Sequence, residues 1–352
     1  MAKREIVTVG TAGMFHCISR CVRRAFLCGN DPSTGKSLEH RNSWVQARLE
    51  LLARTFAVDI CAFTVMPNHL HVVLRIRPDL VESWSDEEIA ARWLLAFPKR
   101  KTEDGRPVEP SAAEIKDLAD QIELMRDRLA DVSWFMRNLN ENIARQANKE
   151  DGCRGRFWEG RSKFQAILDE AALFTCMVFV DLNPVRTGEA AGPEASPRTS
   201  AFLRIRARQA REKLALAEKE GQEGQPNLSF EQQKGRETDI ASPGADQWLY
   251  PFDQDPEEPR PALLDISVDR YLEILDWTSR QFREGGNNSL PGELAAILER
   301  LRIDSGQWLE TTASFGRSFH LAAGRAELMQ ETAAALGRRW LRGLNAGKKA
   351  FS

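Results

Sequence analysis

Two histidines placed one residue apart are the clearest candidates for chemistry in this sequence, which holds only five histidines among 352 residues. His69 and His71 flank Leu70 in the segment MPNHLHVVL, at the start of an apolar run. On a β-strand, residues i and i+2 share a face and lie roughly 6–7 Å apart, so both imidazoles would point the same way. Two such imidazoles can bind one divalent metal ion. The alternative is a pair of polar residues at the start of a half-exposed strand.

The apolar pattern predicts the elements that must position this pair. Strands are expected over residues 14–22, 58–65 and 70–76, with Pro67-Asn68 forming the turn between the last two. A helix is expected between the first two strands, over residues 38–56. Further helices are predicted from Ser85, with Glu88 as its capping partner, and over residues 111–129, 132–148 and 169–182. The core therefore runs strand–helix–strand–strand–helix.

The composition changes after Gly188. Residues 191–262 are rich in Gly, Pro, Gln and charge, which indicates a linker, with one helical insert near 201–220. From residue 263 the pattern is helical, with helices expected over 267–282, 291–304 and 318–344, and the tryptophans there are interpreted as core residues. The sequence thus predicts a domain over 1–190, a linker over 191–262 and a helical domain over 263–352.

Composition sets limits on the partners and the compartment. The formal net charge is −2, so any basic surface must be local. Six cysteines without paired CxxC spacing indicate reduced thiols, as in a cytoplasmic protein. No apolar run reaches the ~18 residues of a membrane span, and the first residues carry no apolar signal core, so no membrane partner is expected.

Basic residues gather in a local cluster between residues 137 and 163, together with Phe157 and Trp158. Arg and Lys contact phosphates, and aromatic rings stack on exposed bases, so this cluster favours nucleic-acid binding. A solvated helix face with two core aromatics is the alternative. The candidate DNA-binding residues are Arg20, Arg23, Arg145, Arg154, Arg156, Trp158, Arg161, Lys163 and Arg186.

Three segments occur in a specific order: FHCISRCVRRAFL, AFTVMPNHLHVVL and GRFWEGRSKFQAILDEAALFTCMVFVDLNPVRTG. In this order, over roughly residues 8–190, the chain resembles the single-tyrosine HUH transposases, which include the REP-associated tyrosine transposases. HUH stands for His, hydrophobic, His, here His69, Leu70 and His71. The resemblance implies an α+β fold with a ferredoxin-like antiparallel sheet backed by helices, and the histidine pair on a central strand.

The resemblance also implies a function, DNA transposition with recombination of DNA strands. The family binds single-stranded or hairpin DNA, and a tyrosine attacks the backbone to form a phosphotyrosine link. A divalent metal ion, Mg²⁺ or Mn²⁺, would be held by His69, His71 and a third polar residue, for which Gln165 is the best candidate. A homodimer is left open.

The nucleophile departs from the family pattern. The chain has two tyrosines, Tyr250 and Tyr271, both outside the matching region, and Phe179 stands where many relatives have tyrosine. Three explanations are open: a remote tyrosine folds back, another nucleophile such as Ser162 serves, or cleavage is lost and DNA binding is kept. The functional alternatives are a non-catalytic nucleic-acid-binding or regulatory protein and a metal-dependent phosphodiesterase without a covalent step.

Overall fold

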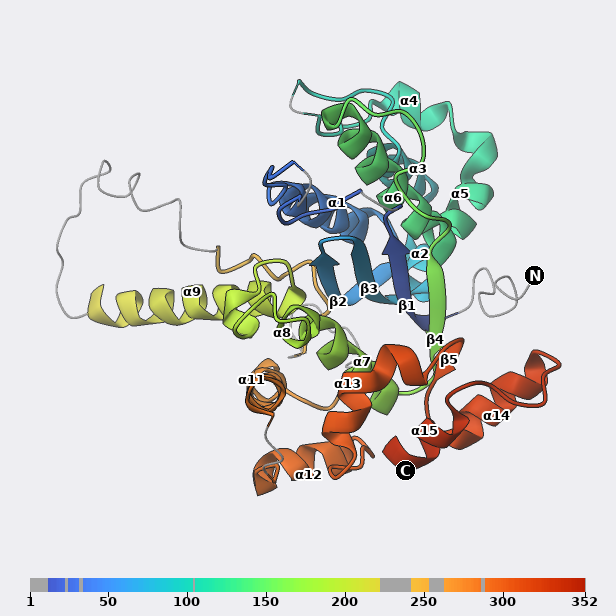
Figure 1. The fold of residues 1–352 in the computed structure, drawn as a ribbon. Coiled ribbons are helices and arrows are strands. Elements are labelled where there is room, and N and C mark those ends of the chain that lie inside the picture. The colour runs from blue at the N-terminus through green and yellow to red at the C-terminus, as the bar shows by residue number, and fades with distance from the viewer. Residues whose placement is uncertain are drawn as a thin grey trace.

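The computed structural model describes residues 12–22, 25–31, 34–103, 105–221, 242–252, 263–285 and 289–351. Its fold class is α+β: a five-stranded mixed sheet lies at the centre, with helices on both faces (Figure 1). The strands are β1 (Gly13–Arg20), β2 (Val58–Met66), β3 (His69–Ile76), β4 (Lys163–Ile167) and β5 (Ala322–Ala323), in the spatial order β2-β3-β1-β4-β5. All neighbours are antiparallel except β4 and β5, which run parallel.

The hairpin of β2 and β3 positions the histidine pair. Pro67 and Asn68 form the predicted two-residue turn, and the register pairs Met66 with His69 and Thr64 with His71. Every residue of β2 is buried, because helices cover both faces of the sheet here. Both predicted strands are confirmed, and the pairing places β3 between β2 and β1.

The first group of helices covers one face of the sheet. It comprises α1 (Arg41–Thr55), α2 (Pro78–Ser83), α3 (Asp86–Ala96), α4 (Ala112–Lys116), α5 (Ile122–Leu129) and α6 (Val132–Glu150). Ser85 caps α3 as predicted, and Ser111 caps α4; each side chain accepts the backbone N–H three residues on. The single helix expected over 111–129 is instead α4 and α5, separated by a short 3₁₀ turn (Ala119–Gln121).

The helix α7 (Glu170–Asp181) lies on the opposite face. Asp169 caps its start, and every residue from Ala171 to Asp181 is buried, so this helix is apolar all round and lies inside the protein. It packs between the sheet and α13 (Trp308–Ser318). The predicted end at residue 182 is confirmed. A short helix, α8 (Asn183–Arg186), follows at once, with Pro184 in its first turn where a missing N–H costs nothing.

The remaining helices are α9 (Ser200–Gly221), α11 (Val268–Glu284), α12 (Gly292–Arg300), α14 (Ala326–Ala335) and α15 (Leu344–Ala350). The single helix predicted over 318–344 is wrong. The chain leaves α13 at Phe319, forms β5 beside β4, and then turns into α14. The apolar spacing of this stretch is shared by several short elements, and sequence periodicity does not show where they break.

The residues after 199 are tied to the sheet and α7 by buried polar contacts. Asp181 accepts hydrogen bonds from Ser200 Oγ (2.5 Å) and from the Tyr271 hydroxyl (2.6 Å). The backbone N–H of Tyr250 donates to the Ile60 carbonyl of β2 (2.8 Å). The predicted domain boundaries at 190 and 262 stay predictions. No helix in the described part of the chain is long and apolar enough to cross a membrane.

Candidate functional site

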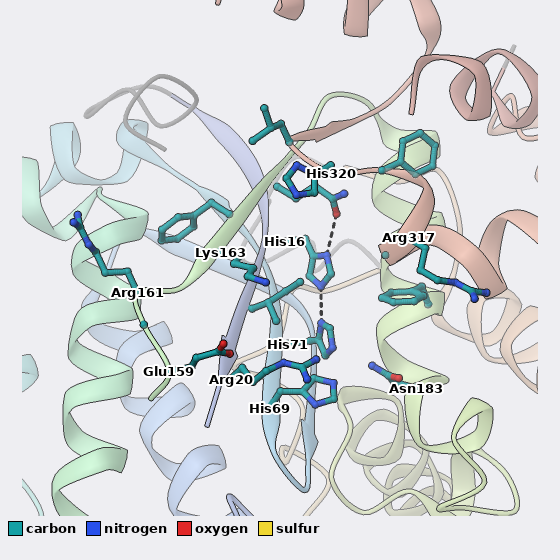
Figure 2. Close-up of a pocket in the computed structure, with 18 of the residues that line it drawn as sticks. His16, Arg20, His69, His71, Glu159, Arg161, Lys163, Asn183, Arg317 and His320 are labelled. Carbon is teal, nitrogen blue, oxygen red and sulfur yellow. Dashed lines mark hydrogen bonds between the residues drawn. The ribbon is translucent and has the colours of Figure 1, made fainter. Parts of the chain in front are cut away.

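A cavity of about 700 Å³ opens on the α7 side of the sheet and contains the histidine pair (Figure 2). Three regions of the chain form its wall: the strands β1, β3 and β4, the helices α7 and α8, and the C-terminal stretch from α13 to β5. The principal lining residues are His16, Arg20, His69, His71, Glu159, Arg161, Lys163, Gln165, Phe179, Asn183, Arg186, Gly316, Arg317, Phe319 and His320.

His69 and His71 share the face that their spacing predicts. Both line the cavity, and their ring centroids lie 4.8 Å apart. Leu70 points to the other face and is fully buried. His71 is 5 % exposed, while His69 at the start of the strand is half-buried. The hairpin therefore brings two imidazoles to one wall of a solvent-connected cavity.

A third histidine, His16, connects His71 to Gln165. The register of β1 pairs His16 with Gln165 of β4, and His16 Nδ1 lies 3.0 Å from Gln165 Oε1. His16 Nε2 lies 2.8 Å from His71 Nδ1 (Figure 2). The amide oxygen can only accept, so His16 donates through Nδ1 and accepts through Nε2. His71 must then carry its proton on Nδ1, which leaves the lone pair of its Nε2 free.

The same tautomer follows for His69. Its Nδ1 lies 2.7 Å from Asn68 Oδ1, an acceptor, so this nitrogen carries the proton and Nε2 carries the lone pair. In metal sites a ligating imidazole usually donates its other N–H to an oxygen or a similar acceptor. His69 and His71 both have that arrangement in this structure.

Burial keeps all three imidazoles neutral at pH 7. Desolvation lowers the pKa of His16 and of His69 to about 4, and it lowers the pKa of His71 well below the usual histidine value. The Arg20 guanidinium and the neighbouring histidines lower the pKa of His69 and His71 further. Neutral imidazoles offer lone pairs, which a metal ion requires.

The donor set fits a divalent ion, although two histidines supply only part of its coordination. In the described residues, no three His, Cys, Asp or Glu side chains are grouped so as to hold a metal ion. Gln165 as third ligand stays a prediction, since its Oε1 already accepts from His16. Asn183 of α8 lines the same cavity and offers a further amide oxygen (Figure 2). Imidazole nitrogen with amide and water oxygen suits Mn²⁺ and similar ions.

Cations outnumber anions on the cavity wall. Arg20, Arg161, Lys163, Arg186 and Arg317 line it, while Glu159 is its only carboxylate among the described residues. This local excess contrasts with the chain's formal net charge of −2. A concave wall of one sign raises the local concentration of oppositely charged ligands.

Among these cations, Arg186 gives the strongest indication of an anionic ligand. Its guanidinium lies over the Phe179 ring, 4.5 Å from the ring centroid. Its Nη1 is buried and has no hydrogen-bond partner among the described residues. Burial and the nearby Arg317 lower the pKa of Arg186 to about 10, so it remains protonated at pH 7. An unpaired buried N–H on a cation is costly, and a bound anion would satisfy it.

The other predicted DNA-binding residues lie in different surroundings. Arg156 lines a second cavity of about 550 Å³, which shares Arg20 and Glu159 with the first. Arg154 is exposed on the loop before β4, and Arg145 on α6 forms an ion pair with Glu141 (2.5 Å). Arg23 lies outside the described residues.

Trp158 has a packing role in this structure. It is 9 % exposed, its Nε1 donates to the Asn140 carbonyl (2.8 Å), and its ring contacts Phe157 edge-on. The backbone of residues 157–159 pairs with the end of β1, which draws both aromatic rings into the core. Neither face of the indole is open to a base in this arrangement.

The candidate nucleophiles do not line the cavity. Tyr271 is fully buried and bonded to Asp181. Tyr250, which falls within the predicted linker, is 1 % exposed, and its hydroxyl accepts from Leu263 N. Ser162 is buried against Ser19 and Asn140. Phe179 does lie in the cavity, 6.0 Å from the rings of both His16 and His71, but it has no hydroxyl.

Two parts of the site were missed by sequence reasoning. His16 falls in the strand predicted over residues 14–22, but only the pairing of β1 with β3 and β4 shows which side chains it meets. The C-terminal wall, with Arg317 and His320, carries no motif at all.

Comparisons with known proteins found a weak similarity to one solved structure. No family model and no curated protein matches this chain. Among solved structures, the chain is similar to a REP-associated tyrosine transposase bound to a REP hairpin, with 14 % identity and a TM-score of 0.32. The similarity covers 55 % of this chain and 78 % of that one. At this level it carries no conclusion about the function of this protein.

Proposed function

We propose that this protein binds single-stranded or hairpin DNA in the manner of an HUH transposase, with a backbone phosphate in the histidine cavity. The observation that carries the proposal is the buried, unpartnered Nη1 of Arg186 in a cavity wall with five cationic side chains and one carboxylate. A phosphate is the anion that matches such a wall, and phosphate contacts supply most of the affinity for a nucleic acid.

The arrangement of the sheet supports the finer fold assignment. Its first four strands lie in the order β2-β3-β1-β4, all antiparallel, with α1 between β1 and β2 and further helices between β3 and β4. A split β-α-β arrangement of this kind is the ferredoxin-like pattern. In that arrangement β3, which carries the histidine pair, is a central strand.

We further propose that His69 and His71 hold a divalent ion through their Nε2 atoms, with Asn183, which lines the same cavity, supplying an amide oxygen. When bound, such an ion would stabilise negative charge on the phosphate oxygens. His16 and Gln165 position the pair without contacting the ion, since their hydrogen bonds fix the ring orientation and tautomer of His71. Arg20 and Arg186 contact the phosphate.

The proposed function does not include a phosphotyrosine step. Phe164, Phe179 and Phe319 line the cavity and carry no hydroxyl, and both tyrosines are buried outside it. The para carbon of Phe179 lies 2.9 Å from the position that a Cβ on Gly316 would occupy, so α13 closes tightly over the end of the ring. The protein would bind DNA without forming a covalent adduct.

The test is binding of a labelled DNA hairpin with a single-stranded flank, measured by anisotropy in Mn²⁺ and in EDTA. Arg186→Gln should weaken binding in Mn²⁺ by at least about 10-fold, because a hydrogen bond from a charged group contributes roughly 1.5–3 kcal/mol. Lys213→Gln, an exposed cation on α9, is the matched control and should bind like wild type. Equal affinity of all three proteins would refute the proposal.

A denaturing gel of the same reactions separates the alternatives. Intact DNA with no adduct supports the binding role proposed here. DNA cut without an adduct would favour the metal-dependent phosphodiesterase, for which the cavity has room for water beside the pair. A covalent adduct would contradict the proposal and would require a nucleophile outside the described wall.

A further inference from the structure

The end of the chain carries a second basic surface, separate from the histidine cavity. Residues 332–351 contain five Arg or Lys and no Asp or Glu. Of these cations, Arg339, Arg342, Lys348 and Lys349 are exposed, and none of the four has an ion pair with a described residue. They lie on α15 and on the stretch between α14 and α15.

An exposed tryptophan lies among these cations. Trp340 is 67 % exposed, and it is the only aromatic residue among the large exposed hydrophobic side chains of the described chain. The prediction that it belongs to the core is wrong, whereas Trp308 is buried and donates from Nε1 to Thr278 Oγ1 (2.9 Å). An indole with this exposure offers ring surface on which a ligand can stack.

The backbone holds Trp340 outward. Its neighbour Leu341 is 2 % exposed and anchors the stretch in the core. Gly343 adopts φ +108°, and a Cβ there would meet Phe319 Cδ1 at 2.7 Å, so only glycine allows this close approach. The stretch is thereby fixed against the segment after α13, and the indole is presented without a large loss of conformational freedom on binding.

Phe319 connects the two sites. It lines the histidine cavity, Gly343 packs against it, and its ring stacks on Phe351 with centroids 5.8 Å apart. In Figure 1, α14 and α15 lie next to α13 and β5, on the side of the molecule where β4 ends. A DNA chain bound in the cavity would therefore have the basic surface as a near neighbour.

We propose that this C-terminal basic surface, made of Arg339, Trp340, Arg342, Lys348 and Lys349, binds an unpaired DNA strand, with Trp340 stacked on a base. The choice of DNA as the ligand rests on the proposed function. A stacked indole needs an unpaired base, because duplex bases have no free face. The four exposed cations would contact the phosphates on either side.

A membrane surface fits these residues less well. Interfacial helices bury a broad apolar face, usually with several Leu, Phe or Trp side chains. Here Trp340 is the only large hydrophobic side chain exposed in the described part of residues 326–351. α15 has seven residues, too few for an amphipathic face of that kind.

The experiment uses the full chain in EDTA, with a fluorescent oligo-dT of 20 nucleotides and a blunt duplex of the same length. Base–aromatic stacking predicts that Trp340→Ala weakens binding of the single strand by about 10-fold or more and leaves the duplex unchanged. Lys348→Ala plus Lys349→Ala should lower the slope of log affinity against log salt by about 0.7 for each lost phosphate contact. Lys213→Ala plus Lys219→Ala, two exposed lysines of α9, is the control and should change neither quantity.

The outcomes separate this inference from the proposed function. Wild-type affinity of both C-terminal variants would overturn the inference, while the predicted effect of Arg186→Gln on hairpin binding in Mn²⁺ would still stand. Loss of single-strand binding in Trp340→Ala, with Arg186→Gln behaving as wild type, would support this surface and refute the cavity. If Trp340→Ala instead abolishes binding to anionic phosphatidylserine vesicles and leaves DNA binding unchanged, the surface is a membrane site and the inference is wrong.

Discussion

The histidine cavity and the C-terminal basic surface present charge in opposite ways. In the cavity, burial keeps three imidazoles neutral and leaves one guanidinium N–H unpaired. On the C-terminal surface, the cations and Trp340 are open to solvent. Buried groups interact strongly but depend on exact neighbours, whereas exposed charges interact through water and are screened by salt. We therefore expect the cavity to make DNA binding depend on a divalent ion and on the position of the phosphate. The C-terminal basic surface should make the affinity for DNA sensitive to salt.

The largest effect expected from this contrast is on stability against pH, measured in EDTA. The pKa of His16 is lowered to about 4 in the folded protein from the usual 6.5, so the unfolded state binds more protons between these values. The free energy of unfolding should rise as pH increases from 4 to 6.5. This added stability should be lost as pH falls from 6.5 to 4. For His16 the rise is up to about 3 kcal/mol, at 1.36 kcal/mol per pKa unit.

Urea denaturation across this pH range measures the effect. His16→Gln should reduce the rise, and Lys213→Gln, which changes an exposed residue of α9, should leave it unchanged. A pH profile that is identical in wild type and His16→Gln would show that His16 is not held neutral by burial.

The next effect concerns Tyr271. Its substitution tests whether this tyrosine has a structural role or acts as a nucleophile. Its hydroxyl donates to the buried Asp181 at 2.6 Å, so Tyr271→Phe should lower the free energy of unfolding by about 1–3 kcal/mol. DNA binding by the folded protein should not change. Thermal denaturation together with the hairpin binding assay checks both; lost DNA binding with unchanged stability would place Tyr271 in the DNA site instead.

The sequence predicts those parts of the fold and the candidate site that depend on contacts between residues close together in the chain. It does not predict the parts that depend on contacts between distant residues. The hairpin that carries His69 and His71 follows from a two-residue turn and two apolar runs, all local signals. The contact of His16 with Gln165 joins residues 149 positions apart, and strand register over that distance has no local signal. The prediction that Trp340 lies in the core is wrong for a related reason. Its exposure depends on the packing of Leu341 and Gly343 against residues distant in the sequence.

The smallest effect concerns the loop before β4. Arg154 is exposed and Arg156 lines the second cavity, so both are open to phosphates. Arg154→Ala plus Arg156→Ala should lower the slope of log affinity against log salt by about 1–2 for hairpin DNA. Titrations at several salt concentrations give the slope, and an unchanged value would assign these arginines to a solvated surface with no DNA contact.

The central claim is that the histidine pair binds a divalent ion, and calorimetric titration with Mn²⁺ tests it most directly. Three proteins are needed: wild type, His69→Ala plus His71→Ala, and His40→Ala as a control for an exposed histidine. We predict one saturable site in wild type and in His40→Ala, and no binding in the double variant, because the two Nε2 lone pairs are its nitrogen donors. Equal Mn²⁺ binding by wild type and the double variant would contradict this account.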